Sequence, residues 1–92
     1  MEETRYEIWV LGYNSEGEPT DFTDGPLFET EDRQEACDNF YETVEDYVIP
    51  VSLCVETGTT TVEFHLEEVV DLEDEEGTEC IDVLKECERS VL

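Results

Sequence analysis

Residues 5–13 are rich in β-branched and aromatic side chains, and this composition predicts a β-strand. Both faces of the strand carry apolar side chains, one with Tyr6, Ile8 and Val10 and the other with Trp9, Leu11 and Tyr13. Apolar residues on both faces are typical of a central strand or of one covered on two sides. Turn-forming residues follow at 14–19, and a short second strand is expected at 20–23, before the Asp-Gly-Pro sequence at 24–26 breaks it.

The clearest helical pattern covers residues 31–48. Thr30 is placed to cap its first turn, and Pro50 prevents the helix from continuing. With about 100° between successive residues, the apolar side chains gather on one side of this helix. That side comprises Ala36, Cys37, Phe40, Tyr41, Val44, Tyr47 and Val48. The opposite side is acidic and comprises Glu31, Asp32, Glu35, Asp38, Glu42, Glu45 and Asp46.

Residues 51–57 and 59–66 both alternate and flank Gly58, which predicts a β-hairpin. The outward-facing residues of its second strand are expected to be Glu63, His65 and Glu67. An acidic loop is expected at 71–77, followed by a short closing helix at 78–91. The apolar stripe of that helix comprises Cys80, Leu84, Cys87 and Val91.

These elements follow the order β-β-α-β-β-α and predict a single α+β domain over residues 1–92. The expected architecture is a four-stranded, largely antiparallel sheet with the helices packed on one face. The N-terminus lacks the basic start and apolar run of a secretion signal, and no stretch is long and apolar enough to span a bilayer. We therefore expect a cytoplasmic protein, not associated with membranes, whose four cysteines are reduced.

Charge changes this picture more than any motif does. The chain has 28 Asp and Glu residues but only 4 Lys and Arg residues, a formal net charge of -24 at pH 7. Such a field attracts basic surfaces and repels DNA, RNA and anionic membranes. Direct binding of nucleic acid is excluded, because contacts to phosphates require cations. The charge predicts a basic protein as the partner.

The sequence contains no recognisable catalytic motif. His65 is expected on the polar face of a strand, with no serine or cysteine placed beside it as a nucleophile. Cys80 and Cys87 fit a buried helix stripe better than a zinc site. The loop at 71–82 is acidic like a calcium loop, but Gly77 falls one position too late. We expect no enzymatic activity, no cofactor and no dedicated metal site, with loose cation binding by clustered carboxylates as the alternative.

The carboxylates of the expected helix recur every three or four residues, and the total charge is comparable to that of an equal length of duplex DNA. In size and charge the chain resembles the small acidic DNA-mimic inhibitors of phages and mobile elements, including anti-CRISPR and anti-restriction proteins. The resemblance implies a non-enzymatic inhibitor that occupies the basic DNA- or RNA-binding channel of a host defence nuclease or effector, such as a CRISPR effector or a restriction enzyme. The expected partner-binding residues are Glu31, Asp32, Glu35, Asp38, Glu42, Glu45, Asp46, Glu63, Glu67, Glu68, Asp71, Glu73, Asp74, Glu75 and Glu76.

Two other interpretations remain open from the sequence. Salt-loving organisms favour acidic, lysine-poor surfaces, and this chain has a single lysine, Lys85. The domain would then be adapted to salt and have an unrelated function. Alternatively, the chain is an acidic adaptor between proteins, in which Trp9, Tyr13 and an exposed sheet edge supply the apolar contact.

Overall fold

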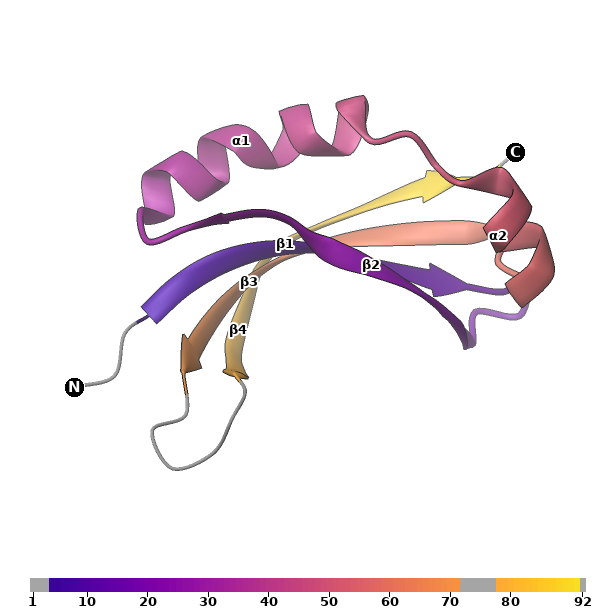
Figure 1. Cartoon of the computed structure of the whole chain (residues 1–92), viewed down its shortest axis with the longest axis horizontal. Coiled ribbons are helices and arrows are strands. Elements are labelled where there is room, and N and C mark those ends of the chain that lie inside the picture. Colours follow the sequence, from indigo (N-terminus) through magenta and orange to yellow (C-terminus); the bar gives the residue numbers. More distant parts are fainter. Residues whose placement is uncertain (1–3, 72–77, 92) are drawn as a thin grey trace.

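The fold is a four-stranded antiparallel sheet with two helices, seen in a computed structural model that describes residues 4–71 and 78–91 (Figure 1). The elements are β1 (Thr4–Tyr13), β2 (Pro19–Thr30), α1 (Arg33–Asp46), α2 (Val51–Thr57), β3 (Thr61–Asp71) and β4 (Thr78–Ser90). The strands lie in the order β2-β1-β3-β4, so β1 is central as its two apolar faces predict. The expected α+β class and antiparallel sheet are confirmed.

The order of elements in the second half of the chain was predicted wrongly. Residues 51–57, expected as a strand, form helix α2, which ends where Gly58 adopts the left-handed conformation at φ 75°. The Gly58 N–H bonds to the carbonyls of Cys54 and Val55 there, as in a helix C-terminal cap. The side chain that α2 buries is that of Cys54, whereas Val51, Leu53 and Val55 are exposed. The alternation of these three valine and leucine residues was therefore misleading.

Residues 78–91, expected as a helix, form strand β4 along nearly their whole length. β4 pairs with the free edge of β3 from Thr78 to Ser90, and this ladder satisfies backbone groups that a helix there would leave unpaired on β3. A register irregularity at Leu84, between the Leu66–Lys85 and Glu67–Val83 pairs, lets Leu84 and Cys87 both pack against the core. Cys80, expected on the same apolar stripe, is exposed.

Strand β2 is longer than predicted and continues through residues 24–26. The register against β1 shifts between Ile8 and Val10, so the extra residues of β2 are accommodated as a bulge instead of ending the strand. Gly25 lies at φ 141° against the indole ring of Trp9, and a Cβ at this position would be 2.9 Å from Trp9 Cε3. A glycine is thus required at the bulge, both for its backbone conformation and for the close approach.

Both helices pack on one face of the sheet, along which Figure 1 shows α1 running. Helix α1 buries Ala36, Phe40 and Val44. Their side chains join a core cluster with Ile8, Val10, Phe22, Cys54, Val62, Phe64 and Leu66. No described helix covers the opposite face, which we call the open face of the sheet. Within the described ranges, neither helix is long and apolar enough to cross a bilayer.

Helix α1 is two residues shorter at each end than predicted, and Asp32 is its N-terminal cap. The Asp32 carboxylate accepts hydrogen bonds from the backbone N–H groups of Gln34, at 2.9 Å, and Glu35, at 3.2 Å. Thr30, the expected cap, instead accepts from the N–H of Asp32 through its hydroxyl. The helix start is therefore stabilised by a carboxylate, which also suits the positive end of the helix dipole.

Two of the few cations in the chain connect β4 to α1. Nη1 of Arg89 donates to the carbonyls of Val44, at 2.7 Å, and Tyr47, at 2.9 Å, where α1 ends. Nζ of Lys85 lies 4.7 Å from the centroid of the Tyr41 ring, on the flank of the same helix. These cations serve internal contacts, and α1 is held on the sheet with its acidic side outward.

Candidate functional site

Among the described residues, the most regular anionic feature is a row of carboxylates on α1 and the two residues before it. We call it the α1 row, and it comprises Glu31, Asp32, Glu35, Asp38, Glu42, Glu45 and Asp46. All of these residues are exposed, whereas Ala36, Phe40 and Val44 on the opposite side of the helix are buried. Because the buried side contacts the sheet, the row points away from it into solvent.

The α1 row has the charge spacing of one nucleic-acid strand. From Glu35 to Asp46 the chain rises about 16 Å along the helix axis, so the five carboxylates within α1 are spaced by about 4 Å along it. A strand of B-DNA carries one phosphate charge per about 3.4 Å. The linear charge density of the row is therefore close to that of a single strand of a duplex.

The row continues to the C-terminal end of α1, where anions are unfavourable. Glu45 and Asp46 lie in the last turn, next to the negative end of the helix dipole, and that turn contains no basic residue. Carboxylates here cost the helix stability instead of adding to it.

The carboxylates of the row have few partners among the described residues. Asp32 caps the helix, and Asp38 accepts a hydrogen bond of 2.8 Å from Nε2 of Gln34. In residues 4–71 and 78–91, no ion pair joins a lysine or arginine to the row. The negative charge of α1 is thus left for solvent or for a partner.

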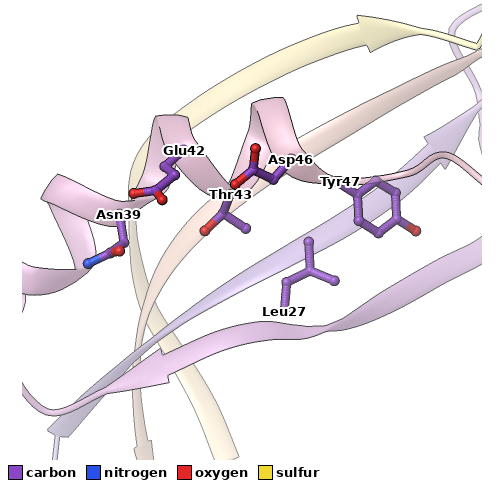
Figure 2. Close-up of a pocket in the computed structure, with 6 residues that line it drawn as sticks. All are labelled: Leu27, Asn39, Glu42, Thr43, Asp46 and Tyr47. Atoms are coloured by element: carbon purple, nitrogen blue, oxygen red, sulfur yellow. The ribbon is translucent and has the colours of Figure 1, made fainter.

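A shallow depression of about 320 Å³ lies beside the C-terminal half of the row, and Figure 2 shows its lining. Glu42 and Asp46 of the row border it together with Asn39 and Thr43 of α1, Leu27 of β2 and Tyr47. The hydroxyl of Tyr47 donates to Oδ2 of Asp24 at 2.8 Å. Burial first, and then this hydrogen bond, raise the pKa of Tyr47, so the phenol stays neutral. The depression combines an apolar patch with carboxylates and hydrogen-bonding groups at its rim.

The remaining expected partner-binding residues do not extend this row. Glu63 and Glu67 alternate with buried residues of β3 and lie on the open face of the sheet, opposite α1. Glu68 lies on the helix-covered face but on a strand, next to Tyr6 of β1 in the register. The side chain of Asp71 and residues Glu73, Asp74, Glu75 and Glu76 lie outside the described residues.

A second acidic cluster, which sequence reasoning missed, lies on the open face. Glu63, His65 and Glu86 place one ligand atom each within 4.8 Å of one another, and Nε2 of His65 is 2.8 Å from Oε1 of Glu63. Glu86 was missed because residues 78–91 were interpreted as a helix. A period of two could have revealed it, because acidic and small polar residues alternate with cationic and apolar ones. The first set is Glu86, Glu88 and Ser90, and the second is Lys85, Cys87 and Arg89.

The surroundings of this cluster are anionic and partly desolvated. Burial raises the pKa of Tyr13, and the negative charges of Glu63 and Glu86 raise it further. Burial also raises the pKa of Glu67, an effect that His65 opposes and Glu7 reinforces. The open face therefore gathers negative charge around a single imidazole.

One carboxylate on the open face is structural. Glu7 is only 4% exposed, because the side chains of Arg5 and Trp9 cover it. Its two oxygens accept hydrogen bonds of 3.0 Å each, from Nε of Arg5 and from the indole nitrogen of Trp9. With both oxygens bonded, Glu7 holds the Trp9 ring in place on the sheet.

Comparison with models of protein families, with curated proteins and with solved structures finds no match to this chain. The functional argument therefore depends on the geometry and charge of its own surfaces. Two of these stand out among the described residues: the α1 row on the helix side and the Glu63, His65 and Glu86 cluster on the open face.

Proposed function

We propose that this protein is a non-enzymatic nucleic-acid mimic that binds through the α1 row in the DNA- or RNA-binding channel of a basic protein. The target class is that of host defence nucleases and effectors, such as restriction enzymes and CRISPR effectors. The observation that carries the proposal is the regular, outward-facing row of carboxylates, whose spacing along α1 resembles that of phosphates along one strand.

The total charge supports the same interpretation. The longest axis of the protein measures 43 Å. A duplex of that length carries roughly 25 phosphate charges at one per about 1.7 Å, compared with the net charge of -24 for the whole chain. A channel that accommodates a nucleic acid of this length would therefore meet a similar total charge in the protein.

The depression beside α1 gives the partner's cations a place to bind. An arginine or lysine has an apolar stem and a charged end, and it fits a site in which an apolar side chain lies near carboxylates. Leu27 supplies the apolar contact, and Glu42 and Asp46 supply the carboxylates. Arginine would bind such carboxylates in the bidentate manner that it uses for phosphate.

Adaptation to high salt is the second candidate, and a specific observation favours it. Exposed carboxylates also lie outside the α1 row, including Glu16, Glu56, Glu79 and Glu88, so negative charge surrounds much of the described surface. The two functions differ in the salt that folding requires. The mimic is expected to unfold cooperatively on heating at ordinary ionic strength, as measured by circular dichroism. A requirement for molar salt to fold would favour salt adaptation and contradict the mimic.

Competition for a labelled nucleic acid tests the proposal. A fluorescent DNA duplex or guide RNA is bound to each member of a panel of restriction enzymes and CRISPR effectors, and the protein is titrated in while anisotropy is recorded. For a genuine target we expect stoichiometric displacement, with affinity falling at least about tenfold as salt rises from about 50 to 200 mM. If the protein displaces nucleic acid from no member of a broad panel, the result contradicts the proposed mimicry.

A further inference from the structure

We propose that Glu63, His65 and Glu86 bind one divalent transition-metal ion, of the Zn²⁺ or Mn²⁺ type, on the open face of the sheet. This site lies on the opposite side of the sheet from the α1 row, and it does not depend on the proposed function.

Strand pairing brings the three ligands together. His65 and Glu86 are directly opposite each other in the β3–β4 ladder, and Glu63 precedes His65 by two residues on the same face of β3. The ligand atoms lie within 4.8 Å of one another. Ligands that bind one metal at about 2.1 Å lie roughly 3 to 4 Å apart, so only small rotamer changes are needed to close the site.

The surface is hollowed beside two of the three ligands, Glu63 and Glu86, which leaves room for an ion and its waters. A depression of about 250 Å³ is lined by Glu63, Glu86, Cys87 and Glu88. Glu88 is opposite Glu63 in the ladder and supplies a further carboxylate at the rim. Water or Glu88 can complete the coordination that three protein ligands leave open.

Two of the three ligands, His65 and Glu63, are held in position before any ion binds. The side chains of His65 and Glu63 are only 13% and 24% exposed and are joined by their 2.8 Å hydrogen bond. Trp9 lies opposite His65 on the β1 side, so the imidazole is bordered by the indole on one strand and by Glu86 on the other. An ion would replace the hydrogen bond between His65 and Glu63 with two metal–ligand bonds.

The donor set distinguishes this site from the acidic surface around it. Two carboxylates and one imidazole suit zinc and manganese, whereas calcium and magnesium prefer oxygen ligands alone. The α1 row has no nitrogen donor and would collect cations only loosely. The local negative charge, which also raises the pKa of Tyr13, adds long-range attraction for any cation.

Bound Mn²⁺ broadens the NMR signals of nearby nuclei, and this broadening locates the site. Manganese is the preferred probe because the thiolates of the free cysteines favour softer ions. Substoichiometric Mn²⁺ is added to the ¹⁵N-labelled protein at about 0.15 M salt, which screens diffuse binding. We expect the Trp9 indole signal and the backbone amides of residues 63–65 and 86–88 to broaden first. Equal or earlier broadening along α1 would overturn the proposal.

Uncharged variants of the ligands test the assignment with the same probe. His65→Gln and Glu86→Gln are each expected to weaken Mn²⁺ binding by at least about tenfold, because each removes one ligand from the ion. Glu42→Gln removes the same charge as Glu86→Gln but lies on α1, and it should leave the affinity nearly unchanged. Glu86 is exposed, so its replacement is not expected to disturb folding. Unchanged affinity in either ligand variant, or equal weakening by Glu42→Gln, would overturn the assignment.

Discussion

Tyr47 connects the end of α1 to β2 through a single hydrogen bond. Its hydroxyl donates to the Asp24 carboxylate across 23 residues of sequence, and its pKa is raised, first by burial and then by this bond. The native state thus keeps the phenol proton at a pH where the unfolded chain, with a tyrosine pKa of about 10, has lost it. The stabilisation is complete below about pH 10 and is lost progressively as the pH rises above it.

We expect Tyr47→Phe to lower the free energy of unfolding by about 1 kcal/mol at neutral pH, the usual value of one hydrogen bond. Urea denaturation at neutral pH and at about pH 10.5 measures the difference. The wild type should lose more stability than the variant between these two conditions, since only the wild type has the Tyr47 proton to lose. A variant that is as stable as the wild type at neutral pH would show that the bond contributes nothing.

At the scale of elements, Arg89 provides what the sequence of α1 lacks at its C-terminal end. The last turn of α1 contains no basic residue, and the guanidinium of Arg89 bonds to two carbonyls where the helix ends. A cation at this end also offsets the helix dipole and the nearby Glu45 and Asp46. The acidic row can extend to the end of the helix because the compensating charge comes from β4.

Arg89→Ala is expected to destabilise the fold by about 2 kcal/mol, because two charge-assisted hydrogen bonds are lost. Arg33→Ala is the matched control, since it removes the same charge from the exposed first residue of α1. There the arginine faces the positive end of the dipole, and its loss should change stability by less than about 0.5 kcal/mol. Thermal or urea unfolding of the two variants gives the comparison. Equal destabilisation by both would mean that total charge, not the contact to α1, determines the result.

The elements that were predicted correctly from sequence are those whose patterns reflect burial. β1 is apolar on both faces and lies between two strands, and the apolar and acidic sides of α1 correspond to its buried and exposed sides. In α2, a period of two placed Val51, Leu53 and Val55 together although none of them is buried. In β4, the helical stripe was a coincidence, and pairing with the edge of β3 outweighed it.

The difference between local and non-local patterns explains which candidate site could be predicted from the sequence. The α1 row could be predicted because a single helix orients all of its residues, and only its local periodicity had to be recognised. The Glu63, His65 and Glu86 cluster required the register between β3 and β4, which is a non-local property. With β4 interpreted as a helix, no sequence argument could bring Glu86 beside His65.

At the scale of the whole molecule, the two acidic surfaces are separated by the sheet. Figure 1 shows α1 on one side of the sheet. The α1 row faces away from the sheet on that side, whereas the cluster around His65 lies on the open face. A channel that binds α1 therefore leaves the open face accessible, and an ion bound there would not occupy the row. The high charge has a cost, because like charges in a compact domain repel one another. This repulsion is better explained if the ordered charges of the α1 row have a function than if the charge is spread evenly without one.

The central claim is that the order of the α1 row, more than the total charge, determines binding. Its most direct test compares the affinities of two variants for a target found by displacement of its nucleic acid. One carries Glu35→Gln, Asp38→Asn, Glu42→Gln and Glu45→Gln, and the other carries Glu16→Gln, Glu18→Gln, Glu56→Gln and Glu79→Gln, an equal change of charge at exposed positions elsewhere. With about 1 kcal/mol for each lost charge contact, the α1 variant should bind at least about 100-fold more weakly, and the second variant less than about tenfold. Equal weakening of the two variants would contradict the account.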